Sequence, residues 1–225
     1  ITGDDSANGT SPATAWRTIE KALGSSGMSS GDTVCIGPGT YRETIDVAMT
    51  SAVAETFVLG DPLGAHTGDE PGEVILTSYE NGPVSAHGAD MCLDLNARDN
   101  LTFENIHFMG GPDNTPAVGS TSGLGQNLTF RKCVFQVPAR GSGGGAGFQA
   151  SATYGEDAAL VIEDCHFYLG GIVFFFPQGE SDYDANIQIR RCLMLFPYRG
   201  IAAFDTGSGA GLGGGVDIEA CTIMA

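Results

Sequence analysis

Asp164, Cys165 and His166 stand side by side in the stretch LVIEDCHFY, which spans residues 160–168. A thiol next to an imidazole, with a carboxylate beside them, has the residue types of a cysteine nucleophile or of a metal site. Either chemistry requires the three side chains to converge on one point. Whether they do so depends on the secondary structure that holds them.

This stretch belongs to a repeat. Five similar segments lie 27 to 32 residues apart: NLTFENIHF from residue 100, NLTFRKCVF from 127, ALVIEDCHF from 159, NIQIRRCLM from 186 and GVDIEACTI from 215. Each alternates with the period of a β-strand, and its two polar residues in the middle predict a corner between two short strands. A repeat of this length without helical periodicity predicts a parallel β-helix, whose coils stack at about 4.8 Å.

The other segments complete the predicted all-β solenoid, with three strands per coil and roughly six to seven coils. Third strands are expected at 147–151, 171–176 and 200–205, and irregular opening coils over 33–95 precede the regular coils of 100–225. The stretch SPATAWRTIEKALG predicts a capping helix over 12–24 that follows Ser11 and places Trp16 over the core. We expect one domain, 1–225, open or truncated at its C-terminal end.

Stacked coils place equivalent residues in columns. One inward column holds Ile106 and four cysteines, Cys133, Cys165, Cys192 and Cys221, whereas His166 points outward. A Cys–His dyad therefore cannot form within the strand. Free cysteine packs as a small apolar residue, so we expect a column of buried, inert thiols. Disulfides between neighbouring coils, or a column of metal ions, are the alternatives, since the coil spacing lies within Cα reach of a disulfide.

Charges at the predicted corner alternate in sign from coil to coil. The last outward position of the first strand is occupied by Glu104, Arg131, Glu163, Arg190 and Glu219, and the next by Asn105, Lys132, Asp164, Arg191 and Ala220. In-register stacking would place like charges together if the sign did not alternate. The pattern therefore predicts a ladder of ion pairs, in which Asp164 has a structural role.

A resemblance to a known family is carried by GDDSANGTSPATAWRTIEKAL at 3–23, GDTVCIGPGTYRETIDV at 31–47 and the NLTFENIHF units. They resemble the pectate-lyase-like superfamily of right-handed parallel β-helix proteins, including its parallel β-helix repeat members of unknown function, over nearly the whole chain. The resemblance implies a right-handed β-helix in a secreted or surface protein such as a lyase, hydrolase, tailspike or adhesin. Lyases of the superfamily carry Ca²⁺-binding carboxylates and a basic Arg or Lys on the outer face of the third-strand sheet.

The third strands of this chain depart from that lyase pattern. By alternation their outward residues are Gln149, Ser151, Val173, Phe175, Ala202 and Phe204, without a carboxylate cluster. Val173, Phe175 and Phe204 instead form an apolar outer stripe. We expect a folded-back loop or a partner subunit to cover this stripe.

Two features favour carbohydrate chemistry. Arg140 in PARG and Arg199 in PYRG occupy matching positions two coils apart, about 10 Å, where they could bind successive acidic groups of a polymer or lie in solvent as turn residues. The loop GESDYDAN could hold a structural Ca²⁺. Its oxygen ligands would be Glu180, Asp182, Asp184 and Asn186. No other cofactor is expected to be required.

Composition limits the partners. The chain has 27 Asp and Glu against 10 Lys and Arg, a net charge of −17, which disfavours nucleic acid and anionic membranes. It has no apolar run of about 18 residues that predicts a membrane span. We expect a secreted or cell-surface, non-enzymatic module that acts through self-assembly or adhesion, as a homo-oligomer or filament joined through the solenoid end or the apolar outer face. The alternative is a polysaccharide lyase-like, hydrolase or carbohydrate-binding protein that acts on acidic glycans.

Overall fold

The strands form three parallel sheets, A, B and C, that wrap around one core. The computed structural model describes residues 3–49, 52–78, 91–110, 116–120, 124–137, 146–151, 159–170, 172–176, 186–195, 201–205 and 215–224. Sheet A holds β1 (Thr33–Ile36), β4 (Thr56–Gly60), β7 (Leu101–Glu104), β10 (Leu128–Arg131), β13 (Ala159–Glu163), β16 (Asn186–Arg190) and β19 (Gly215–Glu219). Sheet B holds β2 (Gly39–Arg42), β5 (Val74–Thr77), β8 (His107–Met109), β11 (Val134–Gln136), β14 (His166–Tyr168), β17 (Leu193–Leu195) and β20 (Thr222–Met224). Sheet C holds β3 (Ile45–Asp46), β6 (Leu93–Asp94), β9 (Val118–Ser120), β12 (Phe148–Ser151), β15 (Ile172–Phe176) and β18 (Ile201–Asp205).

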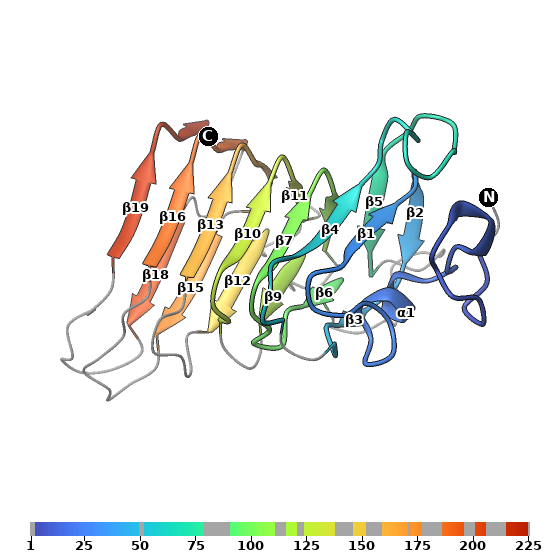
Figure 1. Ribbon diagram of the computed structural model, residues 1–225. Helices are drawn as coiled ribbons and strands as arrows, with labels where there is room; N and C mark the ends of the chain where they lie inside the picture. The colour runs from blue at the N-terminus through green and yellow to red at the C-terminus, as the bar shows by residue number, and fades with distance from the viewer. Residues whose placement is uncertain are drawn as a thin grey trace.

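The chain visits the sheets in the order A, B, C in every coil, so each strand pairs with its equivalent one coil away (Figure 1). In the part of the chain that the structure describes, six coils contribute a strand to all three sheets, and the seventh contributes β19 and β20. The five sequence segments pair in register, with Leu128 opposite Leu160 and Ile187 opposite Val216. The predicted all-β parallel β-helix, with three short strands per coil, is confirmed.

Aromatic rings fill the middle of the core. The rings of Phe103 and Phe130 stack with centroids 5.0 Å apart, and those of Phe135 and Phe167 stack at 4.7 Å. The Phe148 ring meets Phe130 edge-on at 5.5 Å. Stacking and edge-on contacts at these distances are the favourable geometries of aromatic pairs. In-register pairing of equivalent residues therefore produces continuous columns of rings.

The corner between sheets A and B has one recurring backbone conformation. The residue after each sheet A strand, from β7 onward, has a positive φ of 50° to 57°. The residues concerned are Asn105, Lys132, Asp164, Arg191 and Ala220. Left-handed backbone at non-glycine residues is uncommon and turns the chain sharply. The residue that follows each of them occupies the column that contains the four cysteines.

The N-terminal cap differs from the predicted helix over 12–24. A 3-10 turn spans Pro12–Thr14, Ala15 is extended, and the helix α1 covers only Ile19–Leu23. The Asp5 carboxylate accepts hydrogen bonds from the amides of Arg17 and Thr18, and the Glu43 carboxylate accepts from those of Ile19 and Glu20. These tertiary contacts, together with the Thr18 hydroxyl that caps α1, move the start of the helix past Trp16.

α1 nevertheless closes the N-terminal end of the core. Ile19, Ala22 and Leu23 are buried, and the Leu23 carbonyl accepts hydrogen bonds from the amides of Ala48 and Met49, which follow β3. At the other end two core columns come to the surface, since Ile218 and Ile223 are 50% and 53% exposed. Among the described residues, no helix is long and apolar enough to span a bilayer.

Candidate functional site

The trio Asp164, Cys165 and His166 does not converge. Both oxygens of Asp164 accept hydrogen bonds from Arg191, at 2.6 and 2.8 Å, and these bonds hold the pKa of Asp164 below its usual value. The Cys165 side chain is fully buried, whereas the His166 side chain is exposed and its ring meets Tyr168 edge-on. The three groups therefore belong to three different environments.

The cysteine column lies in the corners between sheets A and B. Cys133, Cys165 and Cys192 are buried and Cys221 is partly exposed; all are free thiols. Each sulfur lies 3.2 to 3.5 Å from the carbonyl two residues earlier and 3.5 to 3.6 Å from a carbonyl of the preceding coil. Burial raises the pKa of Cys165, which keeps the thiol protonated. Protonated thiols are poor nucleophiles and poor metal ligands.

A thiol titration tests this arrangement. In native protein we expect a charged disulfide reagent to modify Cys35, which is exposed, and Cys221, and to modify Cys92, Cys133, Cys165 and Cys192 only after unfolding. The measurement is the number of equivalents released before and after addition of denaturant. Rapid native modification of all six thiols would contradict the structure.

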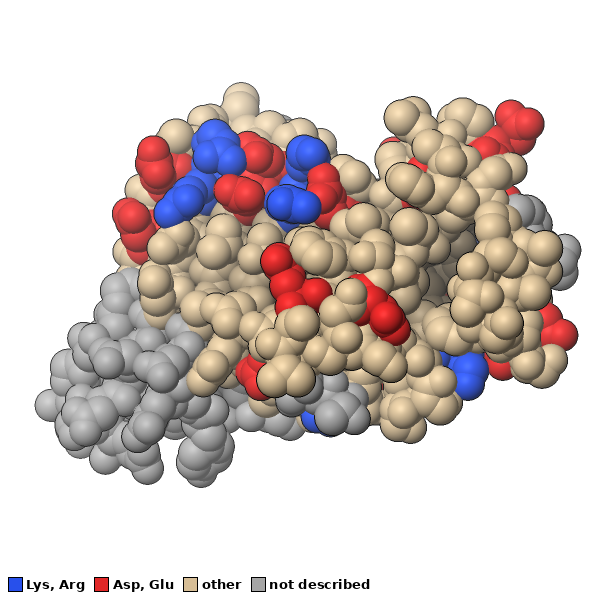
Figure 2. Space-filling model, in the orientation of Figure 1, with Lys and Arg blue, Asp and Glu red and all other residues tan. Residues whose placement is uncertain are grey.

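Ion pairs connect the coils along the A–B corner. In register, Glu104, Arg131, Glu163, Arg190 and Glu219 lie opposite one another on successive strands of sheet A. Glu104 binds both Arg131, at 2.6 Å, and Lys132, at 2.8 Å, while Glu163 binds Arg191 at 3.2 Å. Burial raises the pKa of Glu104, but the bonds from Lys132 and Arg131 outweigh it and the pKa falls. Figure 2 shows basic and acidic side chains alternating along this edge.

Several predicted site residues lie outside the described part of the chain. These are Arg140, Arg199, Glu180, Asp182 and Asp184. Asn186, the last member of the predicted Ca²⁺ set, begins β16 and is exposed, and its side-chain oxygen accepts a hydrogen bond from Gln188 at 3.2 Å. Within the described residues, no three His, Cys, Asp or Glu side chains are grouped to hold a metal ion.

The predicted apolar stripe falls on neighbouring coils of sheet C. β15 and β18 pair in parallel, with Phe175 opposite Phe204 and Val173 opposite Ala202. The side chains of Val173, Phe175 and Phe204 lie outside the described residues, whereas Ile172, at the start of β15, is fully buried. The register alone brings the two phenylalanine positions next to each other.

Sheet C also carries two carboxylates that the sequence pattern did not predict. Asp46 at the end of β3 and Asp94 at the end of β6 lie in register, one coil apart and next to Gly119. Arg98 reaches toward the same end of the sheet, since its Nε donates to the carbonyl of Val47 at 3.1 Å. The signal was present in TIDV and CLDL, whose Ile–Asp and Leu–Asp pairs match. The long insertion between them hid their register.

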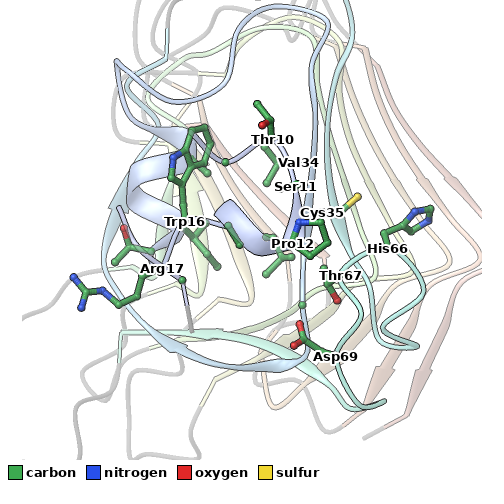
Figure 3. A pocket seen from close by; sticks show the side chains of 18 of the residues that line it. Thr10, Ser11, Pro12, Trp16, Arg17, Val34, Cys35, His66, Thr67 and Asp69 are labelled. Carbon is green, nitrogen blue, oxygen red and sulfur yellow. The ribbon is translucent and has the colours of Figure 1, made fainter. Parts of the chain in front are cut away.

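A cavity of about 520 Å³ opens at the N-terminal end of the solenoid. One wall is β1 with the loop that follows β4, and the other is the N-terminal segment with the start of α1. Figure 3 shows Trp16 and Pro12 facing this strand, with Thr67 and Asp69 at one rim. The indole is fixed, because its Nε1 donates to the Ala7 carbonyl at 2.8 Å and its ring packs on Gly9.

No family model, curated protein or solved structure matches the chain. The resemblance to the pectate-lyase-like superfamily therefore stays an expectation.

Proposed function

We propose that the chain is an extracellular or cell-surface β-solenoid module that acts through self-assembly or adhesion and not through catalysis. The observation that carries the proposal is the register of β15 and β18, which places Phe175 opposite Phe204 on sheet C. Two phenylalanine positions on adjacent coils, with Val173 on the same strand as one of them, fit an apolar docking stripe.

The rest of the described surface supports a scaffold. The corner charges pair with one another, three of the four column thiols are buried, and the regular ring stacks of the core give a rigid rod of coils. A rigid solenoid face with aligned apolar residues suits a second copy of the chain, because a repeating surface meets its equivalent in register.

Charge placed on the stripe is expected to separate the assembly. We expect the wild-type chain to be a dimer or larger, and the double variant Phe175→Lys, Phe204→Lys to be monomeric, because two buried ammonium groups oppose association. The measurement is molar mass by light scattering. Val161→Lys, on the half-buried outer face of β13, is the matched control and should leave the mass unchanged. A monomeric wild-type chain, or a double variant that still associates, would contradict the proposal.

One observation favours the second candidate, a polysaccharide lyase-like protein. Asp46 and Asp94 lie in register on sheet C with Arg98 nearby, and two adjacent carboxylates that could bind Ca²⁺ beside an arginine resemble a site for an acidic polymer. Like charges in register are unfavourable unless a cation offsets them. Formation of unsaturated products from a uronate polymer with Ca²⁺, abolished in Asp94→Asn, would support this function and overturn the first.

A further inference from the structure

Among the described residues, no strand pairs with the outer edge of β1, whose backbone groups face the N-terminal cavity. β1 is the first strand of sheet A and pairs with β4 on one side only. The amides of Phe57 and Asp61 donate to the carbonyls of Asp32 and Ile36, so the even-numbered residues of β1 face β4. In a parallel ladder the alternate residues, Thr33 and Cys35, direct both their N–H and C=O groups away from it. Thr33 and Cys35 line the cavity.

Most side-chain hydroxyls around the cavity already have partners. The Tyr41 hydroxyl donates to the Gly37 carbonyl, the Thr18 hydroxyl to Asp5 and the Thr67 hydroxyl to Asp61, at 2.9, 3.0 and 3.2 Å. Thr10 donates to Asn8, and the hydroxyls of Ser11 and Thr14 bind each other. Few side-chain hydroxyls remain for a sugar. The backbone of Thr33 and Cys35 therefore adds a polar surface that a ligand could use, beside the side chains of Arg17 and His66.

The shape of the cavity fits a short extended chain. β1 has four residues, a length of about 13 Å at about 3.3 Å per residue. Apolar surface from Val34, Ile19 and Ala22 lies toward the core, and Trp16 with Pro12 forms the facing wall. An added strand directs alternate side chains to opposite sides. One set would meet the apolar surface, and the other would point to solvent beside His66 and Thr67.

We propose that this cavity binds an extended peptide segment of another polypeptide, which adds as a strand to the free edge of β1. Unpaired edge groups of a sheet are the usual template for such strand addition. The net charge of −17 favours a segment with basic rather than acidic residues among its solvent-facing side chains. This inference does not rest on the proposed function, because the stripe on sheet C is a different surface.

The test uses the 225-residue chain and an end-blocked hexapeptide of alternating lysine and valine, studied by calorimetry. Two further peptides carry backbone N-methyl groups on alternate residues, one on the lysines and one on the valines. Only one set of amides can face β1, so methylation of that set should weaken binding at least about tenfold, and methylation of the other set should change it less than about twofold. NMR shifts at the amides of Thr33 and Cys35 should accompany binding.

A pair of variants at one position locates the site. Cys35→Pro removes an edge N–H that takes no part in the ladder with β4, a position where proline is tolerated in edge strands, and should abolish binding. Cys35→Ser keeps the N–H and should bind as the wild type does. The methylation test stands even if Cys35→Pro does not fold. Equal binding of both methylated peptides, competition by neutral oligosaccharides, or no binding of the unmethylated peptide would overturn the inference, whatever the oligomeric state of the chain.

Discussion

Phe130→Ala is expected to lower the free energy of unfolding by about 3–5 kcal/mol, because it empties the centre of the core. Phe130 is fully buried, stacks on Phe103 at 5.0 Å and meets Phe108, Phe135 and Phe148 at 5.5 to 6.1 Å. Truncation would leave a cavity in the middle of the ring columns, where coils on both sides hold the walls apart. Urea unfolding followed by circular dichroism measures the loss.

The same column supplies a matched pair of controls. Ile189 and Ile218 lie opposite each other on β16 and β19, but Ile189 is fully buried whereas Ile218 is 50% exposed. Ile189→Ala should lower the free energy of unfolding by about 2–5 kcal/mol. Ile218→Ala should lower it clearly less, because only the first substitution leaves an enclosed cavity. Equal losses in the two variants would mean that the described burial of this column is wrong.

Asp61→Ala is expected to lower the free energy of unfolding by roughly 2–4 kcal/mol, since it removes the acceptor of several backbone amides at once. The Asp61 side chain follows β4 and is buried, with 6% of the residue exposed. Its carboxylate accepts hydrogen bonds from the amides of Ala65, His66 and Thr67, at 3.0, 2.6 and 2.9 Å. The variant should therefore also loosen the loop that forms one rim of the N-terminal cavity. Thermal unfolding and proteolysis within 61–73 are the measurements.

Lowering the pH should weaken the stabilisation that the hydrogen bonds of the Asp61 carboxylate provide. Burial raises the pKa of Asp61, but the hydrogen bonds from Thr67, His66 and Ala65 outweigh it, so the pKa lies below its ordinary value of 3.8. The unfolded chain thus takes up the proton at higher pH than the native one. The stabilisation is complete above about pH 3.8 and is lost as the pH falls through the lower native pKa. Asp61→Asn should flatten this part of the stability profile.

The strands and contacts of the repeating half of the chain were predictable because every coil follows the same pattern of inward, outward and corner residues. Alternation fixed the inward columns, and the corner pattern fixed the pairing of Glu104 with Arg131 one coil away. A residue in such a column has the same neighbours in each coil, so sequence spacing is enough to place it. The trio around Cys165 could be separated for the same reason.

The N-terminal half was less predictable because its contacts are not repeated. The start of α1 depends on Asp5 and Glu43, which lie 13 and 23 residues from amides that they bind. The cavity depends on a loop held by Asp61, and no period in the sequence points to either. Intrinsic helix signals at Ser11 and Pro12 were real, but tertiary capping at Thr18 prevailed over them.

The alternating corner charges give the coils a parity. Odd and even coils carry opposite signs, from Glu104 in the third coil to Glu219 in the seventh. Deletion of the coil that contains Arg131 and Lys132 would bring Glu104 against Glu163, whereas removal of two consecutive coils would restore opposite signs. A solenoid of this type can lengthen or shorten by two coils at a time without placing like charges opposite each other. Gene duplications that add a pair of coils therefore avoid the charge repulsion that a single-coil duplication would introduce.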